Sequence, residues 1–228
     1  MRNKVDGGAI PRGLPGATTA DRGGPASLAW PLAGVAAFAI LTAVGARLVV
    51  FREPVPVTLQ VYFVLAAGMV LGSRMGALSQ LAYLGLGLSG VPVFAAPPHA
   101  GVGCFLGPTG GYLVGFVAAA YVAGFCVERW GSPREGLPRV IPLTVAGLAG
   151  LAALYVPGLA WLTAWMALRG GGFSASLACA WASGVAPFLA LDSLKAAAAS
   201  LSVVLCNRRL CDKTQDGDRH QTQHSCKR

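Results

Sequence analysis

Long apolar runs separated by short polar linkers dominate the pattern of the chain. The runs predict helices at residues 27–50, 57–72, 76–91, 112–127, 140–168 and about 184–206, the last after a short entry helix at 174–183. A helix needs about 20 apolar residues to cross a bilayer, and a shorter one can tilt or sink. The pattern therefore predicts an all-α integral membrane protein, a compact bundle of six transmembrane helices.

Proline, glycine and arginine mark the expected breaks between these helices. Residues 52–56 read as a non-helical linker, and Arg74 marks a tight turn between the second and third runs. Pro157 and Gly158 predict a kink or break in the fifth run, and 169–173 is a glycine-rich turn.

Residues 92–111, here called the lid segment, are too rich in proline and glycine for a helix, yet hold no Asp, Glu, Lys or Arg. Irregular backbone at membrane depth is tolerated where it lines a cavity, so we expect a lid or pocket wall. The sequence GPTGG at 107–111 offers backbone N–H groups before a helix start, which suits polar or anionic ligand atoms. A plain turn and helix entry is the alternative.

The charge of the chain fits a membrane protein and its orientation. Of the 228 residues, 54% are hydrophobic and 12% charged, against about 25% charged in soluble domains. The net charge of +9 lies mostly in termini and alternate linkers, which indicates the positive-inside rule and not nucleic-acid binding. We predict two cytoplasmic termini, with an N-terminal tail (1–26), a membrane domain (27–206) and a basic C-terminal tail (207–228). The residues that set this bias are Arg2, Lys4, Arg12, Arg22, Arg74, Arg129, Arg134, Arg139, Arg208, Arg209 and Lys213.

Asp192 and Lys195 are the notable charges inside an apolar run. No Asp, Glu, Lys or Arg occurs from 170 to 191 or from 196 to 206. Three-residue spacing on a helix places the two side chains on one face. Ionisable residues within the membrane are costly and usually functional, so the pair predicts a binding site near the outer face. A purely structural ion pair is the alternative. The six cysteines are scattered without a CxxC pair, so we expect neither a disulfide framework nor a metal site.

Four motifs occur in an order that resembles a known family. They are PVPVTLQVYFVLAAGMVLG (54–72), GVPVF (90–94), LGPTGGYLVGF (106–116) and PF-x3-D-x2-K (187–195). Together they resemble BioY, the biotin-specific substrate-binding component (S component) of energy-coupling-factor (ECF) transporters, over about residues 42–199. The resemblance implies six transmembrane helices, an outward biotin site, a transmembrane coupling protein and a pair of cytoplasmic ATPases. Residues 95–103, AAPPHAGVG, depart from the glycine-rich pattern that is usual in the family.

The resemblance implies roles for individual residues. Asp192 would accept hydrogen bonds from the biotin urea, and Lys195 would donate to the urea oxygen or the carboxylate, for which Arg47 is a rival. The remaining candidates for biotin binding are aromatic residues or belong to the lid segment: Tyr62, Phe94, Phe105, Gly107, Thr109, Gly110, Gly111 and Tyr112. Biotin is the substrate here, and no cofactor is expected.

Small residues recur every four positions in the first apolar run. Such spacing lets a second helix approach closely, either within the bundle or from a partner. In BioY-like proteins this helix docks on the coupling protein, which implicates Ala33, Ala37, Ala39 and Ala43.

Two other functions remain open. The chain could be an S component for a different vitamin. It could also be an intramembrane enzyme, since Ser183-Gly184 is a fragment of a serine-protease motif and His99 is a potential base. The fragment lacks an orienting third group, so we expect no enzyme. The chain holds no Walker A sequence, so ATP would be used only by partner subunits.

Overall fold

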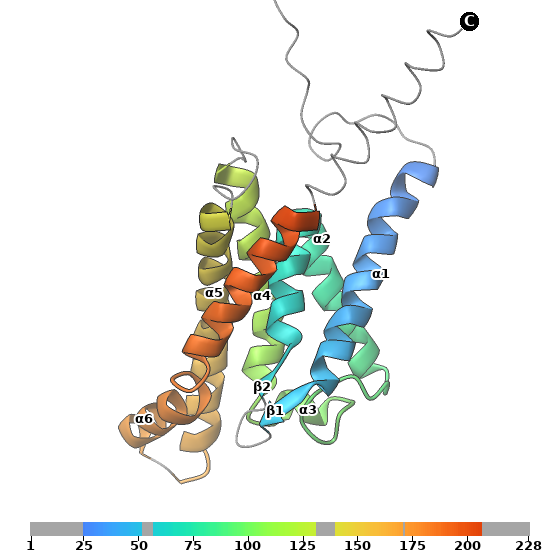
Figure 1. Ribbon diagram of the computed structural model, residues 1–228. Coiled ribbons are helices and arrows are strands. Elements are labelled where there is room, and N and C mark those ends of the chain that lie inside the picture. The colour runs from blue at the N-terminus through green and yellow to red at the C-terminus, as the bar shows by residue number, and fades with distance from the viewer. Residues whose placement is uncertain (1–24, 52–56, 131–139, 171, 207–228) are drawn as a thin grey trace, which may run out of the picture.

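The computed structural model describes residues 25–51, 57–130, 140–170 and 172–206 (Figure 1). Five helices in this part of the chain are long and apolar enough to cross a membrane. In chain order the elements are α1 (Pro25–Arg47), β1 (Val49–Phe51), β2 (Val57–Thr58), α2 (Gln60–Leu88), α3 (Gly103–Leu106), α4 (Gly110–Trp130), α5 (Val140–Ala167), α6 (Phe173–Gly184) and a final helix, Leu189–Cys206.

The helix α2 is folded back on itself at Gly72. The backbone there has φ 82° and ψ 178°, outside the helical region and in a part of conformational space that favours glycine. The Gln60 side-chain amide lies 2.7 Å from the Tyr83 hydroxyl, although 23 residues of continuous helix would separate them by about 35 Å. A Cβ built on Gly76 would lie 2.8 Å from the Cα of Gly68. The two arms of α2 therefore pack side by side.

A carboxylate from α4 stabilises the turn of this hairpin. Glu128 accepts hydrogen bonds from the Ser73 backbone N–H at 2.7 Å and from the Ser73 hydroxyl at 2.8 Å. It thus satisfies a backbone donor at the start of the second arm, as a helix cap does. The sequence places the turn at Arg74; the structure places it two residues earlier, at the only residue of GSR that tolerates a positive φ.

Small residues let the central helices approach closely. A Cβ on Gly150 of α5 would lie 2.9 Å from the Ala119 carbonyl oxygen of α4, and one on Gly111 would collide with the Pro157 carbonyl. Ala119 and Ala123 are fully buried along the same contact, and the backbone of the equally buried Ala120 lies against Gly68 of α2. Close packing through small residues is the usual way in which helices associate in lipid.

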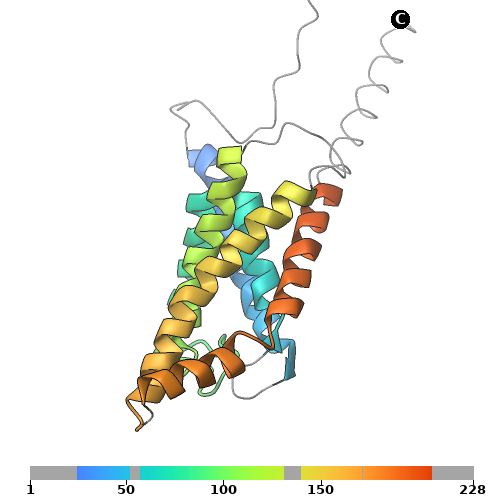
Figure 2. The same cartoon turned by 90° about the vertical axis from the view of Figure 1, so that its left-hand side faces the viewer.

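The two ends of the bundle differ. The start of α1 and the end of the final helix lie at one end, whereas α3, α6 and the β-ribbon lie at the other (Figure 1). Figure 2 shows α6 running across this second end, between α5 and the final helix. The ends of the described membrane domain are therefore on the same side.

The described residues are helical, as predicted, apart from one short β-ribbon and the turns and loops between the elements. The first helix ends at Arg47 and not at residue 50, and β1 pairs with β2 in an antiparallel ribbon that joins Val49 to Thr58. The paired residues, VVF and VT, are mostly β-branched, and such residues favour extended backbone.

Other helix boundaries also differ from the prediction. A one-turn helix, α3, lies inside the lid segment, and α5 continues through Pro157 without the expected break. Proline is tolerated inside membrane helices because neighbouring groups can satisfy the freed carbonyl. The entry helix expected at 174–183 is α6, but the final helix begins at Leu189, after a turn at 185–188. Nearly all of the predicted tails, 1–26 and 207–228, and the linker 52–56 fall outside the described residues.

Candidate ligand-binding site

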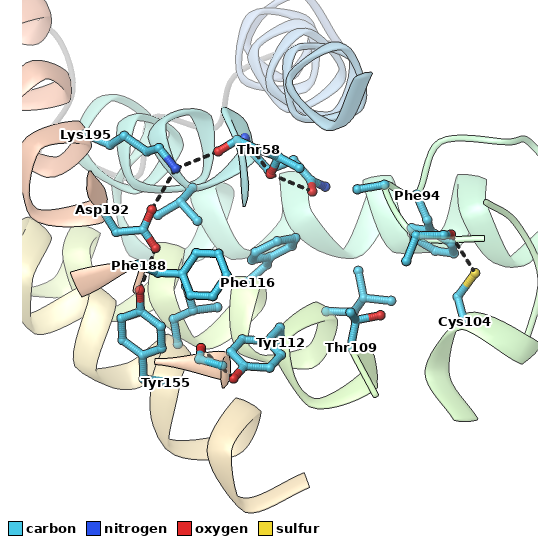
Figure 3. A pocket seen from close by; sticks show the side chains of 17 residues that line it. Thr58, Phe94, Cys104, Thr109, Tyr112, Phe116, Tyr155, Phe188, Asp192 and Lys195 are labelled. Carbon is cyan, nitrogen blue, oxygen red and sulfur yellow. Dashed lines mark hydrogen bonds and ion pairs between the residues drawn. The ribbon is translucent and has the colours of Figure 1, made fainter. Parts of the chain in front are cut away.

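A cavity opens at the end of the bundle that carries α3 and the β-ribbon. The empty space within it is about 650 Å³, a volume that includes open solvent at the mouth. Figure 3 shows polar side chains toward one end and the lid segment toward the other. The lining residues come from most elements of the bundle: Thr58, Gln60, Val61, Phe94, Ala95, Ala96, Cys104, Thr109, Tyr112, Leu113, Phe116, Leu154, Tyr155, Gly184, Phe188, Asp192 and Lys195.

Asp192 and Lys195 lie in the first two turns of the final helix and form an ion pair in the cavity wall. The ammonium is 2.7 Å from one carboxylate oxygen, and Asp192 is only 4% exposed. Tyr155 of α5 donates its hydroxyl hydrogen to the other oxygen at 2.6 Å. The start of a helix also favours a negative charge. The carboxylate is therefore oriented by two neighbours, Lys195 and Tyr155.

Two groups among the described residues accept hydrogen bonds from Lys195, which leaves its third N–H for a ligand. Its ammonium donates to Asp192 and, at 2.7 Å, to the backbone carbonyl of Thr58. An ammonium has three N–H groups, and a carboxylate oxygen has two lone pairs. The pair can thus donate one further hydrogen bond and accept others without losing those that hold it.

A series of buried hydrogen bonds runs from this ion pair to the lid segment. The Thr58 hydroxyl donates to the Gln60 side-chain oxygen at 3.1 Å, and the Gln60 amide donates to the Tyr83 hydroxyl at 2.7 Å. Tyr83 in turn donates to the Val93 carbonyl at 3.2 Å. Lys195 enters the series through the Thr58 carbonyl, so the polar end and the lid segment share one network.

Aromatic rings form the apolar walls. Tyr112 donates to the Gly184 carbonyl at 2.8 Å, which fixes its ring in the cavity wall. Phe94 packs edge-on against Tyr83 and Phe105, with ring centroids 5.6 and 5.7 Å apart. Together with Phe116 and Phe188, these walls fit an apolar ring next to a polar head.

Of the eleven predicted ligand residues, Phe105 packs against Phe94 outside the cavity lining, and five line the cavity: Phe94, Thr109, Tyr112, Asp192 and Lys195. Three of the others make separate contacts outside the cavity lining. The Gly107 carbonyl accepts a hydrogen bond from the Trp161 indole at 2.8 Å, Tyr62 donates to Ser202 at 2.8 Å, and the exposed Arg47 donates to the Pro92 carbonyl.

The remaining two, Gly110 and Gly111, are buried at the start of α4, where any side chain would collide with Phe105 or Pro157 backbone. Their role in the structure is close packing.

Sequence reasoning missed three aromatic lining residues, Phe116, Tyr155 and Phe188, and the polar residues Thr58 and Gln60. Tyr155 carried a usable signal, because it is the one tyrosine in the apolar run 140–168. Thr58 and Gln60 lie inside the predicted run 57–72, and only the packing of the β-ribbon against the final helix shows the role of Thr58.

The residues of the enzyme alternative are engaged elsewhere. Ser183 donates to the Cys179 carbonyl at 2.7 Å, and His99 Nδ1 lies 2.9 Å from the Phe94 carbonyl; neither lines the cavity. Burial raises the pKa of the Cys104 thiol, and a backbone hydrogen bond with His99 opposes this effect only in part. The raised pKa keeps this lining cysteine neutral.

The four alanines of α1 point in different directions. Ala39 is 2% exposed and belongs to the core, and Ala43 packs partly against it. Ala33 and Ala37 are exposed. The four-residue spacing therefore serves packing within the bundle at Ala39, while Ala33 and Ala37 remain on the outer surface.

Comparisons with known proteins identify the family. The model of the BioY family matches residues 19–212. A probable biotin transporter BioY from Pyrococcus horikoshii is 42% identical over 165 residues, covering 72% of this chain and 88% of the relative. The biotin transporter BioY of Rhodobacter capsulatus is 40% identical over 141 residues, covering 62% of this chain and 73% of the relative.

A solved structure has the same fold. It is the crystal structure of an S-component for biotin from an ECF-type ABC transporter, which superposes with a TM-score of 0.66 at 23% identity. The match covers 81% of this chain and 94% of that one. The fold, the relatives and the apolar helices agree, and the chain is a multi-pass membrane protein that belongs to the BioY family.

Proposed function

We propose that this protein is the biotin-binding S component of an ECF-type transporter and takes up biotin from the outer face of the cell membrane. The observation that carries the proposal is the ion pair of Asp192 and Lys195, set in the wall of a largely apolar cavity in a chain of the BioY family. The resemblance of the sequence and the names of the relatives support the same substrate.

The chemistry of biotin fits the two halves of the cavity. Asp192 accepts hydrogen bonds from the urea N–H groups, and the free N–H of Lys195 donates to the urea oxygen or the carboxylate. The thioether ring lies among Phe94, Tyr112 and Phe188. Few polar groups at fixed positions and an apolar surround are the usual basis of small-molecule specificity.

The membrane topology follows from the hairpin and the charges. Each arm of α2 crosses the membrane, which makes six crossings and leaves both termini in the cytoplasm. The common side of the two ends of the membrane domain and the positions of the arginines support this arrangement. The cavity then faces outward. Reporter fusions at the N-terminus and after Arg209 should both indicate the cytoplasm; an external signal at either position would contradict the proposal.

Energy for uptake comes from partners. A transmembrane coupling protein docks on the outer surface of α1, around Ala33 and Ala37, and two cytoplasmic ATPases hydrolyse ATP. The protein itself is not an enzyme and needs no cofactor.

A binding panel tests the substrate. The purified protein in detergent is incubated with radiolabelled biotin, thiamine, riboflavin and folate. We expect saturable binding of biotin alone, competed by unlabelled biotin. Binding of another vitamin in its place would assign the protein to a different S-component class.

A further inference from the structure

Part of the lid segment forms one wall of the cavity. Phe94, Ala95 and Ala96 all line it, and Phe94 is 1% exposed. The ring of Phe94 occupies a notch that Gly87 leaves open, because any side chain at Gly87 would collide with the ring. A shift of this backbone would therefore move the wall that a bound ligand contacts.

Three successive carbonyls of this wall are held by three side chains. Arg47 of α1 donates to the Pro92 carbonyl, and Tyr83 of α2 donates to the Val93 carbonyl. The third donor, to Phe94, is His99, which lies farther along the lid segment itself. Two of the anchors come from helices of the bundle, whereas the third depends on the fold of the lid segment.

His99 engages both backbone polar groups of Phe94. Its carbonyl accepts the Phe94 N–H at 2.9 Å, and its Nδ1 lies 2.9 Å from the Phe94 carbonyl oxygen. A carbonyl oxygen can only accept, so Nδ1 carries the hydrogen and donates. The backbone of His99 has φ 68°, a left-handed conformation that is uncommon outside Gly, Asn and Asp. The ring hydrogen bond and this conformation close the segment into a tight loop.

We propose that His99 is a positioning residue, which holds Phe94 in the cavity wall and thereby slows the release of the bound ligand. The inference rests on the proposed function for the identity of the ligand, biotin. His99 does not contact the cavity itself; it acts through Phe94.

Three substitutions separate the hydrogen bond from the backbone conformation. In His99→Asn the side-chain nitrogen takes the place of Nδ1 and can donate, and asparagine tolerates a positive φ. His99→Asp has the same shape but presents an acceptor to the Phe94 carbonyl. His99→Gly permits the backbone conformation and removes the side chain. His99→Asn and His99→Asp are the matched pair of variants. If His99→Asp does not fold, His99→Gly replaces it in the comparison.

The main measurement is the rate of release of radiolabelled biotin from purified protein. We expect the His99→Asp and His99→Gly variants to release biotin about three- to ten-fold faster than wild type, with little change in the association rate. A change of this size corresponds to the loss of one hydrogen bond. Asn should remain near wild type. The inference would be overturned if the His99→Asp and His99→Gly variants released biotin at the wild-type rate. It would also be overturned if His99→Asn released biotin as fast as His99→Gly.

A second readout does not depend on biotin. Amide hydrogen exchange in a peptide that spans residues 91–103 should be faster in the His99→Asp and His99→Gly variants than in His99→Asn and wild type. The melting temperatures of the four proteins should be equal. If the wild type fails to bind biotin and exchange still follows this order, the proposed function fails and the role of His99 in holding Phe94 stands. If biotin binds tightly and neither exchange nor release changes, the inference alone fails.

Discussion

The two ends of the cavity are built on different principles. At the polar end, Asp192 and Lys195 stand on a regular helix, and Tyr155 from a second helix fixes their geometry. At the other end, irregular backbone forms the wall, and side chains hold its carbonyls one by one. Charges need rigid, well-placed partners, whereas a wall that admits a ligand must be able to open. The comparison suggests that the polar end sets affinity and the lid segment sets access.

The strongest way to break the polar end is Lys195→Met. It strands the buried Asp192 carboxylate, and loss of one member of such a pair at a binding site costs about 2–5 kcal/mol. We expect the affinity for biotin, measured by calorimetry in detergent, to fall about thirty- to several-thousand-fold. Asp192→Asn should have a similar effect, because the amide places a donor where the carboxylate only accepts.

The double variant Asp192→Asn with Lys195→Met is the control for a structural ion pair. Replacing both members of a buried pair often leaves stability unchanged or improved. We expect a stable protein that does not bind biotin. Tight binding in this variant would mean that the pair only stabilises the fold.

Tyr155→Phe tests the contribution of one hydrogen bond at the polar end of the cavity. It removes the 2.6 Å hydrogen bond to Asp192 while the ring that lines the cavity remains. Hydrogen bonds to charged groups contribute about 1.5–3 kcal/mol, so the affinity for biotin should fall about ten- to more than a hundred-fold. Tyr121→Phe, on an exposed tyrosine of α4, is the matched control and should leave binding unchanged. Equal affinities in the two variants would exclude Tyr155 from the site.

The charged pair of the polar end could be predicted from the sequence, whereas the side chains that hold the pair and the lid segment in place could not. Asp192 and Lys195 stand out because charge is rare in apolar runs, and Phe94, Thr109 and Tyr112 lie in motifs of the resemblance. The six-run pattern likewise located the long helices, and Gly72 broke α2 near the expected turn.

Contacts between distant segments leave little trace in a single sequence. Thr58 reaches Lys195 across 137 residues, and Tyr83 reaches the lid segment from inside an apolar run. Gly110 and Gly111 have a structural role that the sequence does not reveal. Their motif suggested a loop for ligand atoms, but close packing against neighbouring backbone requires glycine there.

Substitutions on the buried and exposed faces of α1 distinguish packing within the bundle from docking of a partner. Ala39 is buried, so Ala39→Trp should overpack the core and lower the free energy of unfolding by about 1–3 kcal/mol, measured as a lower melting temperature. Ala37 is exposed, and Ala37→Trp should leave melting and biotin binding intact while reducing uptake in cells that contain the coupling protein. Normal uptake by Ala37→Trp would place the docking surface elsewhere.

The smallest effect tests whether the two ends communicate. Tyr83→Phe removes both the hydrogen bond to Val93 and the acceptor of the Gln60 amide, and leaves the ring that supports Phe94. Loss of the hydrogen bond to the Val93 carbonyl, taken alone, corresponds to about a three- to ten-fold change. If Tyr83 mainly anchors the lid segment, the release of biotin should become faster at an unchanged association rate. If it also orients Lys195 through Gln60 and Thr58, Tyr83→Phe should weaken binding less in the Lys195→Met background than alone, as residues in one network do. Equal effects in both backgrounds would show that the polar end and the lid segment act independently.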